Sequence, residues 1–178
     1  LSPALEGSLR AFDRGVGLPI GHSSIWMRTA GGFSPRDRAL PFANFFFGGF
    51  GNNYVDSGDE KRYRHFESFP GAELNEIGGR NFAKGTLEWN LPPWRFRRLG
   101  TPGVYATWLR PALFATGLST NIDSDTARRT AVSLGGQFDI RLTVLSNQDM
   151  TLSFGGAVAL EDGYPPRREA MISLKVLR

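Results

Sequence analysis

A strict alternation of apolar and polar residues over residues 132–144 is the feature that most limits how this chain can fold. The apolar members are Val132, Leu134, Gly136, Phe138, Ile140, Leu142 and Val144, and the intervening polar members include Ser133, Gln137, Asp139, Arg141 and Thr143. Successive side chains of a β-strand point to opposite faces of the sheet. The alternation therefore predicts a long strand with one apolar face and one polar face.

Weaker versions of this pattern predict about seven further strands. We expect them near residues 4–14, 22–30, 42–50, 80–91, 104–116, 150–160 and 169–177. The strand at 80–91 is the clearest of these, with Leu87 and Trp89 on one face and Lys84 and Glu88 on the other. Between the strands we expect a link at 15–20, a basic turn at 94–98 and a long loop at 51–78. The chain is thus predicted to be all-β and antiparallel.

The lengths of the strands and of their connections favour a membrane barrel. Strands of about 9–13 residues exceed the usual five or six and approach what a tilted strand needs to cross a bilayer. Long connections follow the third, fifth and seventh expected strands, whereas the connection after the sixth is very short. Short turns at one end and long loops at the other are typical of outer-membrane barrels. We therefore predict a transmembrane antiparallel β-barrel segment with about eight strands.

A soluble β-sandwich or lipocalin-like ligand-binding barrel would also show alternation with one apolar face. Two features favour the membrane over this alternative. Full charges stand in mid-strand on the polar faces, where a small packed interior would reject them, and glycines interrupt the apolar faces. The charged residues are Arg10, Lys84, Glu88, Asp139, Arg141 and Lys175, and the glycines are Gly85, Gly136 and Gly156.

Composition and motifs exclude several other functions. The 178 residues contain no cysteine, and their net charge of +4 is spread along the chain, so neither thiol chemistry nor nucleic-acid binding is expected. The two histidines, His22 and His65, lie in different segments, and no nucleophile elbow, zinc-protease motif or P-loop occurs. We expect neither enzyme activity nor a cofactor, and no metal site. The chain opens without methionine or a leader, which predicts a piece of a longer protein.

Two motifs around the long loop resemble those of a known family. The first is Phe46-Phe47-Gly48-Gly49-Phe50, and after the loop come Ile77-Gly78-Gly79-Arg80-Asn81 and Thr86-Leu87-Glu88-Trp89-Asn90-Leu91-Pro92. These segments resemble the C-terminal half of the bacterial surface-antigen barrels, which include the outer-membrane assembly factor and the two-partner secretion translocators. The resemblance covers nearly the whole chain. It implies that residues 1–178 are the last eight strands of a barrel of about sixteen, in the bacterial outer membrane.

The resemblance also implies a contact between the long loop and the barrel wall. In the family, an Arg-Gly-aromatic segment of the loop reaches acidic residues on adjoining strands. Glu88 matches the first acid, but the comparable loop segment begins at Phe69 and carries no arginine, and Arg110 stands near the place of the second acid. We hypothesise that Glu88 and Arg110 form a cross-strand pair in the lumen that replaces the loop contact; the alternative is that Arg110 is an independent lumenal charge. Whether Glu88 and Asp139 converge stays open.

Aromatic residues near the expected strand ends suit the interfacial girdle of a barrel. Phe45, Phe47 and Trp89 are accordingly expected to face lipid. The functions that follow are a surface-antigen barrel that inserts or translocates unfolded polypeptide or anchors an upstream periplasmic domain, or a passive porin-like channel. Outer-membrane lipid is the expected partner in both cases.

Overall fold

The protein is an all-β structure whose long strands form one antiparallel sheet. The computed structural model describes residues 10–34, 44–50, 61–145 and 148–177. The elements are β1 (Arg10–Ile20), β2 (Ser23–Phe33), β3 (Phe45–Phe47), the single-turn 3-10 helix η3 (Arg62–Arg64), β4 (Ile77–Gly79), β5 (Asn81–Asn90), β6 (Trp94–Thr101), β7 (Val104–Thr120), β8 (Arg129–Val144), β9 (Gln148–Glu161) and β10 (Arg167–Leu177). No helix long and apolar enough to cross a membrane occurs in these ranges.

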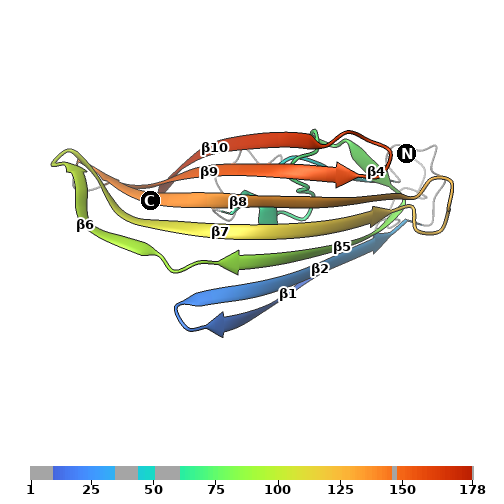
Figure 1. Ribbon diagram of the computed structural model, residues 1–178, viewed down its shortest axis with the longest axis horizontal. Helices are drawn as coiled ribbons and strands as arrows, with labels where there is room; N and C mark the ends of the chain where they lie inside the picture. The colour runs from blue at the N-terminus through green and yellow to red at the C-terminus, as the bar shows by residue number, and fades with distance from the viewer. Residues whose placement is uncertain (1–9, 35–43, 51–60, 146–147, 178) are drawn as a thin grey trace, which may run out of the picture.

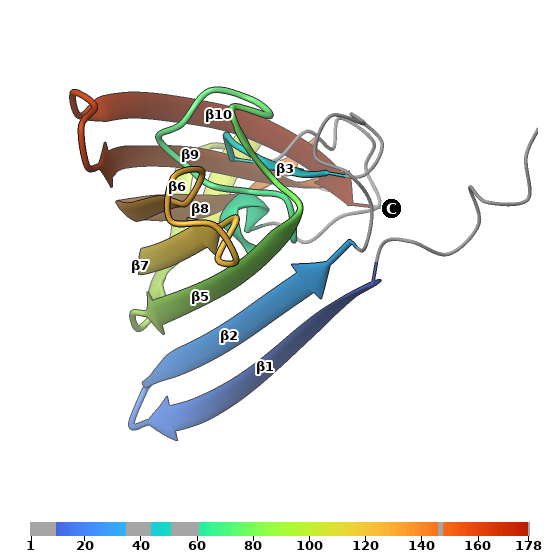
Figure 2. The same ribbon diagram turned by 90° about the vertical axis from the view of Figure 1, so that its right-hand side faces the viewer.

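The main sheet follows the order β1-β2-β5-β7-β8-β9-β10, with β6 paired to β7 beyond the end of β5. The strands lie side by side along the long axis of the molecule (Figure 1). Seen along the strands, the sheet curves from β10 to β1, and β3 lies on its concave side (Figure 2). Within the described residues β1 and β10 are the two edges and do not pair with each other, so this sheet is open.

β5 and β6 are two parts of one strand position, because both pair with β7. Asn90 is opposite Ala112 and Trp94 is opposite Leu109, and the register shifts further along β6. The gap contains Pro92 and Pro93, which have no backbone N–H to donate to a ladder. The expected basic turn at 94–98 is therefore wrong: these residues begin β6.

Two other expected boundaries also need correction. The first strand was expected at residues 4–14; its first part, 4–9, lies outside the described residues, and the described strand runs from Arg10 to Ile20 and so includes the expected link. Pro19 lies opposite Ser24, one residue before the end of β1, so its missing N–H affects only the last part of this ladder. The expected strand at 42–50 reduces to Phe45–Phe47 among the described residues, and this short strand pairs with β4 in a separate two-stranded sheet.

The long connection between β2 and β5 returns across the concave face of the main sheet. Phe47 is fully buried and packs with Phe69, Ile77, Phe82 and Leu118 in one apolar cluster. The Phe45 ring also meets Phe82, with the ring centroids 4.8 Å apart. The expectation that Phe45 and Phe47 face lipid is therefore wrong, because both contribute to the packing between the loop and the sheet.

Gly71 lies where the loop packs closely against β9. Its φ is +95°, and a Cβ built on it would stand 2.5 Å from the backbone nitrogen of Ala159. We expect Gly71→Ala to lower the free energy of unfolding by about 2 kcal/mol, because left-handed backbone strain and a backbone clash act together. Urea unfolding in detergent measures the change. Gly163→Ala is the matched control, since Gly163 has φ +79° but no atom near its absent Cβ; an equal loss in both variants would contradict the clash.

Candidate functional site

The two faces of the main sheet differ in polarity. Polar and charged side chains are buried on the concave face, including Lys84, Thr86, Glu88, Thr116, Ser133, Gln137, Asp139, Thr151, Ser153 and Glu161. Large apolar side chains are exposed on the other face, including Val16, Leu18, Met27, Leu87, Trp89, Leu113, Val132, Leu134, Phe138, Leu160, Ile172 and Leu174. Soluble proteins bury such apolar residues and rarely bury charge. Trp89 lies on the outer face, as the alternation predicted.

Glu88 anchors the loop to the concave face. Its side chain has no exposed surface, and its carboxylate accepts hydrogen bonds from Arg64 Nε at 2.8 Å and Arg64 Nη2 at 2.5 Å. Asn90 Nδ2 donates a third bond at 2.5 Å. Such a two-point guanidinium–carboxylate contact is both strong and geometrically specific. Since Arg64 belongs to η3 in the loop, the contact fastens the loop to β5.

Lys61 joins this pair to a second buried carboxylate. Its ammonium nitrogen lies 3.9 Å from Glu88 Oε1 and 4.0 Å from Asp139 Oδ2, and it donates a hydrogen bond to Asn90. Asp139 in turn accepts from Gln137 Nε2 at 2.6 Å and from Ser153 Oγ at 2.7 Å. Glu88 on β5 and Asp139 on β8 therefore converge on one loop cation, which answers the question that the sequence left open.

The hypothesis of a Glu88–Arg110 pair is wrong. Glu88 stands opposite Phe114 on β7, and its carboxylate is held by Arg64. Arg110 is opposite Asp139, and its guanidinium lies over the Trp108 ring, 4.8 Å from the ring centroid. The expectation that the loop lacks an arginine for the wall contact is also wrong, because Arg64 makes one.

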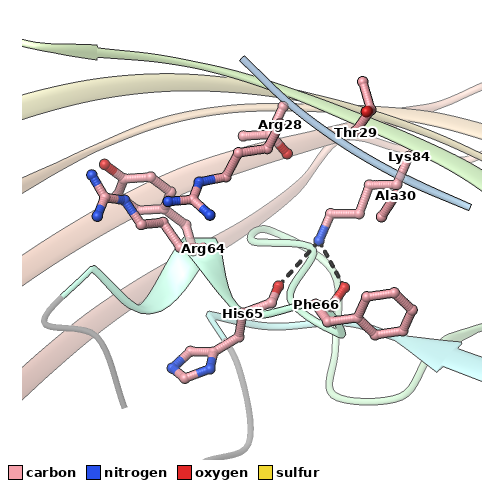
Figure 3. A pocket seen from close by; sticks show the side chains of 9 residues that line it. Arg28, Thr29, Ala30, Arg64, His65, Phe66 and Lys84 are labelled. Atoms are coloured by element: carbon pink, nitrogen blue, oxygen red, sulfur yellow. Dashed lines mark hydrogen bonds between the residues drawn. The ribbon is translucent and has the colours of Figure 1, made fainter. Parts of the chain in front are cut away.

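Lys84 holds the loop from the wall side. Its buried ammonium group donates to the backbone carbonyls of His65, Phe66 and Ser68. Figure 3 shows the Lys84 side chain reaching two of these carbonyls, beside a small pocket that Arg28 and Arg64 also line. Arg141 lies apart from the cluster and pairs with Asp149 on β9 at 3.0 Å.

The glycine positions that carry the family resemblance allow close backbone approach. A Cβ on Gly48 would stand 1.8 Å from the Glu73 carbonyl oxygen, and a Cβ on Gly79 would stand 2.6 Å from Thr120 Cβ. Gly49 donates its N–H to Ala72 O at 3.1 Å, and Phe50 packs edge-on against Phe114. Gly78 and Gly79 form β4 with Ile77. All five residues therefore belong to the folded loop.

A second set of contacts fastens the loop near the opposite ends of the strands. Glu161, almost completely buried, binds Arg129 at 2.6 Å and Arg167 at 2.5 Å, and Arg167 also contacts the loop residue Glu76. Glu169 on β10 accepts from the backbone N–H groups of Phe50 and Gly71, at 3.1 and 2.8 Å. The sequence analysis missed these residues, because each alone looks like a surface charge.

Burial lowers the pKa of Lys61 to about 8, even though Glu88 and Asp139 favour its charged form. The unfolded chain then holds a proton that the folded chain has lost as pH rises from about 8 toward 10.5. Folding stability should therefore rise with pH in this window. We expect urea midpoints of the wild type to gain on those of Lys61→Met from pH 8 upward. The control is Lys175→Met, which replaces a half-buried lysine on β10 and whose urea midpoints should change with pH as those of the wild type do. If the midpoints of Lys61→Met rose with pH in parallel with those of the wild type, the prediction would be contradicted.

Comparison of this chain with known proteins finds no relative. No known protein family, no curated protein and no solved structure gave a significant match to this chain. Within the described ranges, no group of three or more histidine, aspartate or glutamate residues comes together in a way that could hold a metal ion. The site is thus a set of ion pairs and carbonyl contacts between an inserted loop and a sheet.

Proposed function

We propose that this chain is part of a bacterial outer-membrane β-barrel of surface-antigen type, which inserts or translocates polypeptide and carries a periplasmic domain upstream. The observation that carries the proposal is the reversed polarity of the sheet, with charge buried on the concave face and large apolar side chains exposed on the other. Lipid is the solvent that makes such an outer face stable, and a lumen is the environment that accommodates the inner one.

The arrangement of the connections supports the same proposal. The connections β1–β2, β6–β7 and β8–β9 span two or three residues at one end of the sheet, whereas β2–β5, β7–β8 and β9–β10 are longer and lie at the other. Barrels of the outer membrane have short periplasmic turns and longer external loops. The open edges at β1 and β10 would be closed by strands from upstream in the same protein, as the resemblance implies.

The inserted loop favours polypeptide handling over a passive porin. A porin needs a water-filled lumen, but here loop residues pack against the sheet through the Phe47 cluster and through Arg64, Lys61 and Lys84. We expect the full-length protein to show low steady conductance in planar bilayers. Large, steady, voltage-independent conductance would favour the porin alternative.

Membrane insertion itself is tested on the full-length protein extracted from membranes with detergent. An outer-membrane barrel migrates faster on a denaturing gel before boiling than after it, because the folded barrel resists the detergent. We expect this heat-modifiable shift and cofractionation with outer membranes. A monomer that stays soluble without detergent would overturn the proposal and favour the soluble β-sandwich.

A further inference from the structure

An open cavity of about 460 Å³ lies on the concave side at the short-turn end of the sheet. It is surrounded by the β1–β2 turn, by the C-terminal end of β5, and by Lys61 and Arg64 of the loop. Strand β7 contributes Arg110. Three basic side chains line the cavity, from Lys61, Arg64 and Arg110, and no carboxylate of the described residues does. A cleft lined by one sign of charge focuses the electric field and raises the local concentration of ions of opposite sign, here anions.

The charges around the cavity are only partly compensated. Glu88 and Asp139 lie behind its wall and balance Arg64 and Lys61. Arg110 has no carboxylate within 4.0 Å among the described residues, and its one close partner is the face of Trp108. Among the residues that the structure describes, two carboxylates therefore face three cations, which leaves one positive charge in excess in this part of the chain.

We propose that this cavity binds the carboxylate side chains of an acidic polypeptide segment in the lumen, with Arg110 as the principal ligand. The planar fork of a guanidinium matches a carboxylate with two parallel hydrogen bonds. Trp26 and Ser24 complete the wall of the cavity beside the cations. The site would hold one or two side chains at a time, since its volume is far below that of a folded module.

The position of the cavity favours a polypeptide over a lipid as the source of the anion. The cavity opens on the buried, concave side of the sheet, whereas lipid would lie on the side of the apolar outer face. It also lies at the end of the short turns, which is the periplasmic end under the proposed function, so the inference rests on that function. A segment that enters from the periplasm would meet Arg110 before it reached Arg64 and the loop.

The test uses the full-length protein in detergent, labelled with fluorotryptophan so that Trp26 and Trp108 report on the cavity by NMR. The probes are acetyl-Gly-Asp-Gly-Asp-Gly-amide and the same peptide with asparagine in place of aspartate. We expect saturable shifts with the aspartate peptide, at least about tenfold weaker affinity for the asparagine peptide, and a similar loss in Arg110→Gln. Arg168→Gln, which removes an exposed arginine at the opposite end of the sheet, should bind like the wild type.

Several outcomes would overturn the proposal that this cavity binds an acidic polypeptide. Equal binding of the two peptides, unchanged binding in Arg110→Gln, or inorganic phosphate binding as tightly as the aspartate peptide would each do so, the last by assigning the cavity to free phosphate. Arg110→Lys keeps the charge without the planar fork and should retain intermediate affinity, which keeps the test valid where Arg110→Gln fails to fold. The heat-modifiable gel shift is measured in a separate experiment. A protein that lacks this shift but still binds the aspartate peptide would overturn the proposed function and support the binding site.

Discussion

Leu134→Arg is expected to cost about 2–4 kcal/mol of folding free energy in lipid vesicles, the penalty for arginine near the bilayer midplane on a barrel surface. Leu134 lies in the middle of β8 on the outer face and is 50% exposed. In a soluble protein, a charged side chain at a position this exposed would change stability by only about 0.5 kcal/mol. The same substitution thus separates a lipid-facing surface from a water-facing one.

The measurement is urea unfolding from vesicles, with the full-length protein and with Leu145→Arg as the control. Leu145 is 80% exposed in the β8–β9 turn, beyond the strand ends, and arginine there should be tolerated. A depth-dependent penalty, large at Leu134 and small at Leu145, would support the membrane proposal. Near-zero effects at both positions, with a protein stable in plain buffer, would contradict it.

The strands of the main sheet were predictable because their signal is local. Alternation over 80–91 and 132–144 needs no knowledge of neighbours, and the structure confirms the strands there, with β8 extending from Arg129. The inward position of Glu88 and Asp139 and the outward position of Trp89 follow from the same period. The alternation could not predict how the strands pair. The break at Pro92 and Pro93 gives β7 two successive partners, β5 and β6.

The inserted loop was mispredicted for a different reason. The run around Phe45–Phe47 is apolar whether it faces lipid or packs on the inside of a sheet, so its composition could not decide between them. Arg64 was overlooked because its partner Glu88 stands 24 residues away, in another element. A local signal did exist: the segment Lys61-Arg62-Tyr63-Arg64 puts three cations around an aromatic residue, and this is an expensive set to bury without acidic partners.

Arg64→Met should lower the free energy of unfolding by about 3–5 kcal/mol, because it leaves the carboxylate of Glu88 buried without its strongest partner. The double variant Arg64→Met/Glu88→Gln removes both charges together and should recover a large part of this loss. The ion pair would then show a coupling energy in a double-mutant cycle. Arg62→Met removes the neighbouring arginine, whose Nε donates to Ser173 Oγ; it serves as the matched control and should cost less.

The same variants decide whether the loop is a fixed plug or a movable one. Lys84 and Glu169 hold the loop backbone independently of Arg64, so Arg64→Met should loosen the region around η3 while β3 and β4 stay in place. Amide exchange should therefore accelerate at residues 61–64 more than at 77–79, and bilayer conductance should rise only modestly. The opposite result would be amide exchange that accelerates equally along the whole loop while conductance rises to a porin-like level. That result would mean that the Arg64–Glu88 contact alone holds the loop in place and that the other contacts depend on it.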